Sequence, residues 1–195
     1  MLIQTQNHYL TRRTRIVLAG ACKGEEIGIY KLSHKGAFIY ALEPSPHTCE
    51  GLRAKWGNDP DVEIMEVAAW VRNGPLMFKT YKAFRGDSVY ERGGKYGWKK
   101  EVEVRGIDFA EFLKGLGEVD VVRLNIEGSE YAVILHCLEQ NALDKVAYLS
   151  IACHGDRIEG LKGPHKKMVE ALKAWDPTSK KYKLFGKGGE KCLIK

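Results

Sequence analysis

The stretch RIVLAGACKGEEIGIYKLSHKGAFIYALE, from Arg15 to Glu43, decides the fold. It begins with a short apolar run that ends at Gly20, continues through a glycine-containing turn into a segment of helical composition, and closes with a second apolar run before Glu43. Short apolar runs bounded by glycine are typical of buried strands. The order strand, helix, strand therefore predicts a βαβ unit, in which two parallel strands lie in one sheet.

The same alternation continues along the chain. Residues 45–57 predict a helix, because Ser45 and Pro46 form a favourable helix start and Gly57 a favourable end. The apolar segment 61–70 predicts a third strand, and segments 119–128 and 145–155 predict two more, with helices between them. We therefore predict an α/β fold, a mostly parallel sheet with helices on both faces.

Two segments depart from this rhythm. Residues 75–82 and 99–107 alternate apolar with polar side chains, which predicts an inserted antiparallel hairpin; residues 78–105 are predicted to form a lid. The glycine-rich stretch 84–98 predicts a mobile loop at its tip, and residues 182–195 predict a C-terminal antiparallel hairpin. Because no linker divides the chain, residues 1–195 are predicted to form a single domain.

Length, composition and charge narrow the class of protein. The 195 residues, 44% of them hydrophobic, can form one sizeable core, and no apolar run is long enough to cross a bilayer. Without an N-terminal apolar stretch, we expect a cytoplasmic protein with no membrane partner. The five cysteines are widely spaced and form no CxxC pair, which favours reduced thiols and no metal site. The sequence leaves the oligomeric state open.

The net charge of +6 is unevenly distributed. Residues 106–161 carry ten acidic and four basic side chains, so the positive excess lies in residues 78–105 and 162–195. Basic segments permit a nucleic-acid partner, but a solvated lysine-rich surface is the commoner explanation. Charge alone is therefore weak evidence for a nucleic-acid partner, which stays open as a less favoured alternative.

The residues that follow the predicted strands point to a nucleoside ligand. Gly20 and Gly24 bracket a turn at which a ligand can approach the backbone, and Glu43, after the second strand, can accept hydrogen bonds from both ribose hydroxyls. The dinucleotide motif G-x-G-x-x-G and the phosphate-loop motif are absent from the sequence, which favours a nucleoside without a pyrophosphate. The alternatives are glycines that serve only packing and a surface carboxylate at Glu43.

With these motifs in order, the sequence resembles the FkbM-type family of S-adenosylmethionine-dependent methyltransferases, which have the class I Rossmann-like fold. The resemblance extends from Arg15 to the C-terminus. It lies in IVLAGACKG (16–24), IYALEPSP (39–46), VEIMEVAAW (62–70), GIDFAEFL (106–113) and VDVVRLNIEGSEYAVIL (119–135). The last segment is similar to the family's most specific motif, which usually ends in Asp-x-Glu-Gly-x-Glu.

The resemblance implies S-adenosylmethionine as cofactor and O-methylation of a sugar, glycan or natural-product hydroxyl. It places the cofactor against Gly20, Ala21, Cys22, Lys23 and Gly24 (methionine end), Glu43 and Pro44 (ribose), and Val67, Ala68 and Ala69 (adenine). It places Asn125, Glu127 and Ser88 near the transferred methyl group, with Ser88 as an acceptor contact.

Three residues that follow predicted strands are candidates for acting on the acceptor hydroxyl. Glu127 and His154 follow two strands that we expect to be adjacent, so both are candidates for orienting or deprotonating the acceptor, together with Asn125. The alternatives are that Glu127 caps the following helix, that His154 is a structural residue and that Glu130 lies on the surface.

Two positions depart from the family pattern. Leu18 stands where the family usually has an acid that helps to hold the cofactor's ammonium group, and Glu25 or Glu26 could substitute for it. Asn125 stands where Asp is usual, and an amide is a poor general base and a weak ligand for a hard cation, so no metal is predicted. These departures leave two alternatives to the small-molecule enzyme, namely a nucleic-acid ribose methyltransferase and a catalytically degenerate cofactor-binding scaffold.

Overall fold

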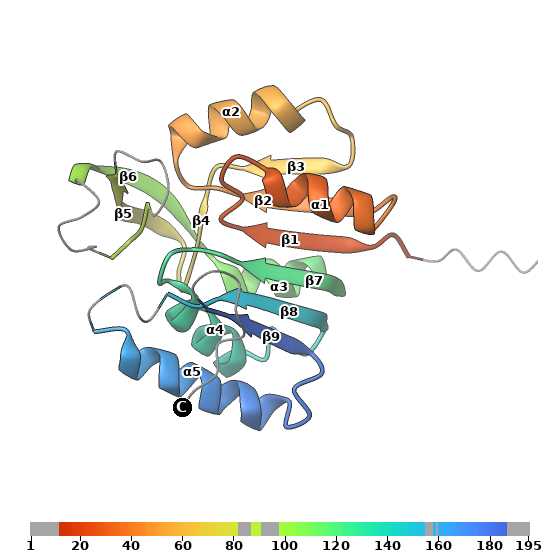
Figure 1. The fold of residues 1–195 in the computed structure, drawn as a ribbon, viewed down its shortest axis with the longest axis vertical. Coiled ribbons are helices and arrows are strands. Elements are labelled where there is room, and N and C mark those ends of the chain that lie inside the picture. The colour runs from red at the N-terminus through yellow and green to blue at the C-terminus, as the bar shows by residue number, and fades with distance from the viewer. Residues whose placement is uncertain (1–11, 82–86, 91–97, 155–157, 159, 187–195) are drawn as a thin grey trace, which may run out of the picture.

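A computed structural model describes residues 12–81, 87–90, 98–154, 158 and 160–186. Its central element is a six-stranded sheet with the strand order β3-β2-β1-β7-β8-β9, in which every neighbouring pair is parallel (Figure 1). The strands are β1 (Arg15–Ala19), β2 (Phe38–Leu42), β3 (Val62–Met65), β7 (Val119–Leu124), β8 (Val146–Ala152) and β9 (Tyr182–Phe185).

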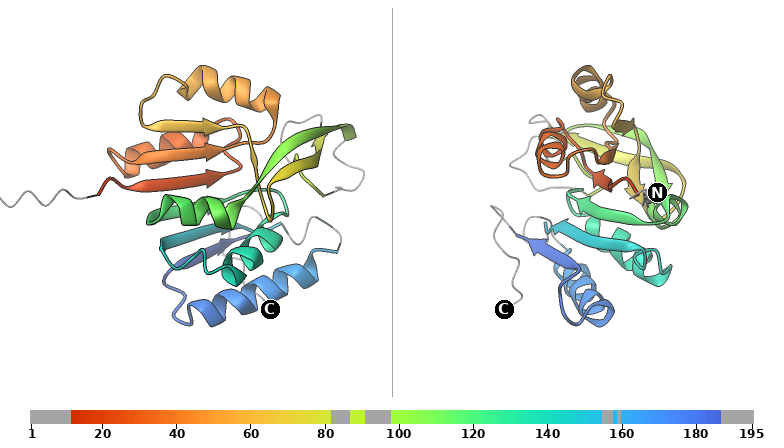
Figure 2. Two further views of the ribbon diagram at one scale, coloured as in Figure 1. Left: turned by 180° about the vertical axis from the view of Figure 1, so that it is seen from behind. Right: turned by 90° about the vertical axis from the view of Figure 1, so that its right-hand side faces the viewer.

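Helices cover both faces of this sheet, as the sequence predicts (Figure 2). The helices are α1 (Glu25–Ser33), α2 (Pro46–Trp56), α3 (Phe109–Leu116), α4 (Glu130–Glu139) and α5 (Lys162–Trp175). Side chains of α1 and α2 pack in one hydrophobic cluster, and those of α3, α4 and α5 pack in another. The predicted α/β fold with a mostly parallel sheet is therefore confirmed.

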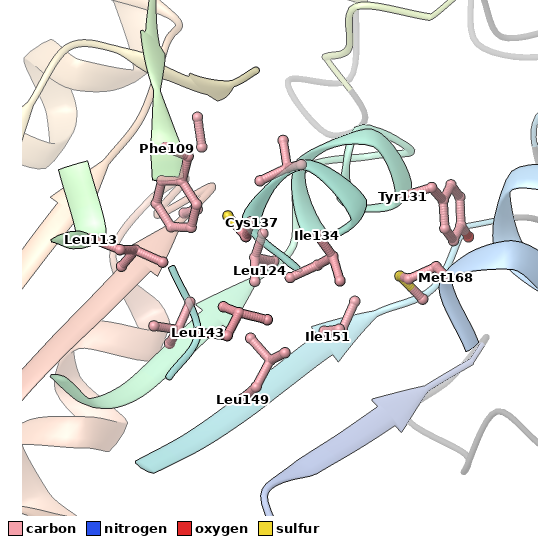
Figure 3. Close-up of a cluster of buried hydrophobic side chains, with 14 of the residues drawn as sticks. Phe109, Leu113, Leu124, Tyr131, Ile134, Cys137, Leu143, Leu149, Ile151 and Met168 are labelled. Atoms are coloured by element: carbon pink, nitrogen blue, oxygen red, sulfur yellow. The ribbon is translucent and has the colours of Figure 1, made fainter. Parts of the chain in front are cut away.

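The burial of β1 on both faces explains why residues 16–19 are all apolar. Ile16 and Leu18 point into the cluster beneath α1 and α2, whereas Val17 and Ala19 point into the cluster beneath the other three helices. All four residues are at most 1% exposed, as expected for a strand covered on both faces. Figure 3 shows the larger cluster, with its labelled side chains gathered between the sheet and the helices.

A second, three-stranded sheet contains the predicted hairpin. Its strands are β4 (Ala68–Trp70), β5 (Gly74–Tyr81) and β6 (Trp98–Asp108), in the order β4-β6-β5. β5 and β6 are antiparallel, as predicted. The prediction of one strand over residues 61–70 is wrong, because the chain leaves the large sheet after Met65 and enters the small one at Ala68. The N–H of Val67 donates to the Met65 carbonyl oxygen at 2.9 Å, which marks a tight turn between the two strands.

Two further predicted segments lie partly outside the described residues. β9, the first half of the predicted C-terminal hairpin, pairs in parallel with β8, and residues 187–195 lie outside the described residues. Most of the mobile loop predicted over residues 84–98 also lies outside them, namely residues 84–86 and 91–97. Within the described part of the chain, none of the helices has the length and apolar character to cross a membrane.

A pair of glycine substitutions tests how β1 joins β7. Gly20 has a φ of +82°, and a Cβ on it would lie 2.2 Å from the Asn125 carbonyl oxygen. We expect Gly20→Ala to lower the free energy of unfolding by about 2–4 kcal/mol, because it adds both left-handed strain and a backbone clash.

The matched control is Gly51→Ala inside α2, where a Cβ would meet no heavy atom within 4 Å. It should raise stability by about 0.5–1 kcal/mol in the same urea denaturation experiment. Similar stability changes in the two variants would contradict the close approach of the β1 turn to Asn125.

Candidate functional site

A cavity of about 970 Å³ opens at the carboxyl ends of the parallel strands. It lies where the strand order changes direction, because β2 and β7 flank β1 on opposite sides. Open α/β sheets bind their ligands at such switch points. Most of the residues that the sequence analysis selects line this cavity, namely Gly20, Ala21, Cys22, Glu43, Pro44, Val67, Ala68, Ala69, Asn125, Glu127 and His154.

The glycine turn after β1 is held by both neighbouring strands. The N–H groups of Gly20 and Ala21 donate to the Leu42 carbonyl oxygen at 2.9 and 3.0 Å, which ties the turn to β2. On the other side, the Asn125 N–H donates to the Ala19 carbonyl oxygen at 3.0 Å. The turn therefore forms a fixed backbone wall of the cavity.

Glu43, which follows β2, is only 6% exposed and ties two elements together. Its Oε2 accepts the Cys22 N–H at 2.9 Å, and its Oε1 accepts the Ser45 N–H at 3.0 Å. Burial raises the pKa of Glu43 to about 7, although both N–H donors act to lower it. The carboxyl group therefore lies at the cavity wall with a proton that it can lose near neutral pH.

Val67 and the first two residues of β4 form an apolar wall. Val67, Ala68 and Ala69 are each 5% exposed and line the cavity. Phe78 and Val89 pack in one cluster with Ala68 and also line the cavity. Two polar residues, Thr48 on α2 and Asp87, belong to the lining as well, and the sequence analysis did not select any of these four residues for the cofactor.

A buried carboxylate organises the end of β7. Glu130, at the start of α4, is fully buried, so the interpretation that places it on the surface is wrong. Its Oε1 accepts the Ile126 N–H at 2.9 Å and its Oε2 accepts the Gly128 N–H at 2.7 Å. The same Oε1 lies 2.8 Å from Nδ1 of His154. Glu130 thus closes the loop after β7 and anchors the histidine that follows β8.

His154 connects this carboxylate to the cavity. It is 4% exposed, its backbone N–H donates to the Tyr131 hydroxyl at 2.7 Å, and its Nε2 lies 3.4 Å from Oε2 of Glu127. Because an ionised carboxylate only accepts hydrogen bonds, Glu130 places the proton of a neutral ring on Nδ1. Nε2 is then an acceptor on the side of Glu127. Glu127 itself has a φ of +54°, a left-handed conformation that is uncommon for a residue with a side chain.

Three of the predicted contacts lie elsewhere. Lys23 is exposed, and Gly24 packs against α2, where a Cβ on it would lie 2.5 Å from Nε1 of Trp56, so neither residue lines the cavity. Ser88 is fully buried, and its hydroxyl donates to the Glu127 carbonyl oxygen at 2.7 Å. Ser88 therefore fastens the hairpin region to the β7 loop, while its neighbours Asp87 and Val89 line the cavity.

An ion pair that the sequence analysis missed lies on a further wall. Arg123 on β7 contacts Glu26 on α1, with 3.0 Å between Nη2 and Oε1 and 3.1 Å between Nε and Oε1. Its Nη1 lies 3.3 Å from the Ser150 hydroxyl oxygen, and its guanidinium carbon lies 5.5 Å from the centre of the Phe185 ring. All four residues line the cavity. The available signal was a single arginine in a strand predicted to be buried, which requires a partner.

A family described as the methyltransferase FkbM domain matches residues 19–176 of this chain. A solved methyltransferase FkbM from Methylobacillus flagellatus KT has a TM-score of 0.53 and 12% sequence identity, over 82% of this chain and 37% of that chain. This chain therefore corresponds to well under half of that protein's length. At this identity the likeness shows a shared fold.

Weaker structural likenesses lie in another class of protein. The yeast methylglyoxal/isovaleraldehyde reductase Gre2 in complex with NADPH has a TM-score of 0.49 and 12% identity, over 89% of this chain and 53% of that chain. Gre2 from Candida albicans has a TM-score of 0.47 and 12% identity, over 89% and 56%. A search of the curated proteins gave no match.

The buried carboxyl of Glu43 predicts an unusual pH dependence of stability. Folding raises its pKa from 4.5 to about 7, so its stabilising contribution is full below about pH 4.5 and is lost as the pH rises through 7. Between pH 5 and pH 8 the ligand-free wild type should lose about 2–3 kcal/mol of unfolding free energy relative to Glu43→Gln.

Denaturant titrations of both proteins at the two pH values measure this difference. Glu50→Gln, at an exposed position of α2, is the control and should follow the wild type. Parallel pH profiles for wild type and Glu43→Gln would show that Glu43 is not the buried titrating group.

Proposed function

The chain belongs to the FkbM methyltransferase family, and on this premise we propose that it transfers a methyl group from S-adenosylmethionine to a hydroxyl of a sugar, glycan or small natural product. One observation carries the proposal. A single cavity collects the glycine turn, the acid after β2, the apolar segment after β3 and a carboxylate–histidine pair after β7 and β8.

The residues of the cavity fit such a cofactor. The backbone of Gly20 and Ala21 would face its methionine end, and the carboxylate of Glu43 would accept hydrogen bonds from the ribose hydroxyls. Residues 67–69 would provide the apolar contact for adenine. Glu43 already uses both oxygens to accept backbone N–H groups, but each carboxylate oxygen has a second lone pair for a hydroxyl.

The charge of the cavity also supports this ligand class. Among the described residues that line it, Arg123 is the single Lys or Arg, whereas five are acidic, namely Glu25, Glu26, Glu43, Asp87 and Glu127. A cleft lined by one sign of charge attracts ligands of the opposite sign. S-adenosylmethionine carries a sulfonium and an ammonium group against one carboxylate, so its net charge is complementary. The described part of the lining would repel a phosphodiester, which favours a small-molecule or glycan acceptor over nucleic acid.

The reaction requires little beyond alignment and proton removal. When bound, the cofactor would supply a methyl group on a positively charged sulfur. In an in-line displacement the acceptor oxygen bonds to the methyl carbon as the carbon–sulfur bond breaks, which leaves a neutral thioether. Glu127 and His154 would hold the acceptor hydroxyl and take its proton as the new oxygen–carbon bond forms. If the proton reaches Nε2, the 2.8 Å contact with Glu130 stabilises the charged ring. The amide of Asn125 would orient the acceptor.

Binding of the product is the direct test of the proposal. We expect the wild-type chain to bind S-adenosylhomocysteine with a dissociation constant in the micromolar range by calorimetry, because the cavity provides a separate wall for each part of the nucleoside. No binding at millimolar ligand would contradict the enzyme and support the scaffold alternative. Retention of RNA by the wild type in a gel shift that persists at moderate salt would instead support the ribose methyltransferase.

A substitution of Glu127 tests whether this residue accepts the proton of the acceptor hydroxyl. Glu127→Gln keeps the size of the side chain but removes its charge, so we expect S-adenosylhomocysteine affinity within about threefold of wild type and methyl transfer slowed about 10²–10⁴-fold. Transfer is measured with radiolabelled S-adenosylmethionine on a panel of sugars, glycans and small hydroxyl compounds. Glu50→Gln is the control, and unchanged turnover in Glu127→Gln would remove Glu127 from this role.

A further inference from the structure

β1 places no charged side chain in the described lining of the cavity. Leu18, the residue before Ala19 at the end of β1, is 1% exposed and packs in the apolar cluster beneath α1 and α2. The amino-acid end of S-adenosylmethionine carries an ammonium and a carboxylate group, and both lose hydration when they enter a cavity. Partners for these two charges must therefore come from other elements.

The Glu26–Arg123 ion pair lies at the required place. Arg123 is the register partner of Leu18 across the β1–β7 pair, so its backbone lies directly beside the end of β1. Glu26 is the second residue of α1, and α1 begins directly after the glycine turn. Both side chains line the same cavity as Gly20 and Ala21.

We propose that Glu26 and Arg123 together bind the amino-acid end of the cofactor, with Glu26 accepting hydrogen bonds from the ammonium group and Arg123 donating to the carboxylate. This inference rests on the proposed function and concerns the same cavity. A zwitterion presents opposite charges a short distance apart, and the ion pair presents the complementary pair. The protein thereby supplies from α1 and β7 the charges that β1 does not provide.

The two side chains keep the hydrogen-bonding capacity that this role needs. The contacts of Arg123 with Glu26 and Ser150 use Nε–H and one N–H on each terminal nitrogen, so each terminal nitrogen has a second N–H for a carboxylate. The side chain of Glu26 is 31% exposed and that of Arg123 is 14% exposed. Glu26 is thus open to a ligand, whereas Arg123 is held in place.

The surroundings of Arg123 fix its orientation before a ligand arrives. Ser150, on the adjacent strand β8, is 6% exposed and contacts Nη1, and the ring of Phe185 lies beside the guanidinium group. A charged group that is already ordered loses little conformational entropy on binding. We therefore expect this part of the cavity to make a large contribution to cofactor affinity.

The test compares two nucleosides that differ only at the amino-acid end. S-adenosylhomocysteine has this end, whereas 5′-methylthioadenosine carries the same adenosine and sulfur without it. Wild type should bind S-adenosylhomocysteine more tightly. Glu26→Gln and Arg123→Gln should each weaken S-adenosylhomocysteine about 10–100-fold, because each removes a charged hydrogen-bond partner, and should change methylthioadenosine affinity less than about threefold.

Glu50→Gln is the control. It removes the same charge from an exposed position of α2 that does not line the cavity. It should change the affinity for either ligand by less than about threefold. Methylthioadenosine binding by each variant shows in the same experiment that its cavity is folded.

The outcomes separate the inference from the proposed function. Equal weakening of the two ligands in Glu26→Gln and Arg123→Gln, unchanged S-adenosylhomocysteine affinity, or an equal effect in Glu50→Gln would overturn the inference. A wild type that binds methylthioadenosine and S-adenosylhomocysteine equally would also overturn it while leaving the nucleoside site in place. A wild type that binds neither would contradict the proposed function and the inference with it.

Discussion

The carboxylate of Glu130 is the group around which the candidate site is built. It is fully removed from solvent. Its two oxygens accept the backbone N–H groups of Ile126 and Gly128, and one of them also contacts Nδ1 of His154. A buried carboxylate is tolerated only where such donors replace water. One side chain thereby joins the end of β7, the start of α4 and the end of β8. The left-handed backbone of Glu127 lies inside the loop that Glu130 closes, which explains how this uncommon conformation is maintained.

The charge of the cavity lining differs in sign from the net charge of the sequence. The net charge of +6 is a property of the whole sequence, and by itself it suggests an anionic partner. The cavity has the opposite character, since its described lining holds five acidic residues and one arginine. That arginine is paired with Glu26. The described lining of the cavity is therefore rich in acidic residues, although the sequence as a whole is basic.

The sequence predicts those parts of the fold and site that depend on strand order. Carboxyl ends of parallel strands meet at one edge of a sheet, so Gly20, Glu43, Asn125, Glu127 and His154 could be assigned to one cavity from their positions alone. The division of residues 61–70 between two sheets could not be predicted, because an apolar run shows no signal where the chain changes partners.

The features that sequence analysis missed depend on partners distant in the chain. Arg123 contacts Glu26, almost a hundred residues away in the chain, and the buried Glu130 contacts His154. Ser88 lies in a segment whose composition predicts a loop, yet its hydroxyl is enclosed because it donates to the Glu127 carbonyl. Pairings of this kind leave no periodic pattern, so they become visible only in the folded chain.

A crystal structure with S-adenosylhomocysteine bound tests the central claim most directly. The account predicts adenine against residues 67–69, both ribose hydroxyls within hydrogen-bonding distance of Glu43, and the sulfur facing the side of the cavity formed by Glu127 and His154. A ligand bound outside this cavity, or bound within it with the ribose away from Glu43, would contradict the account.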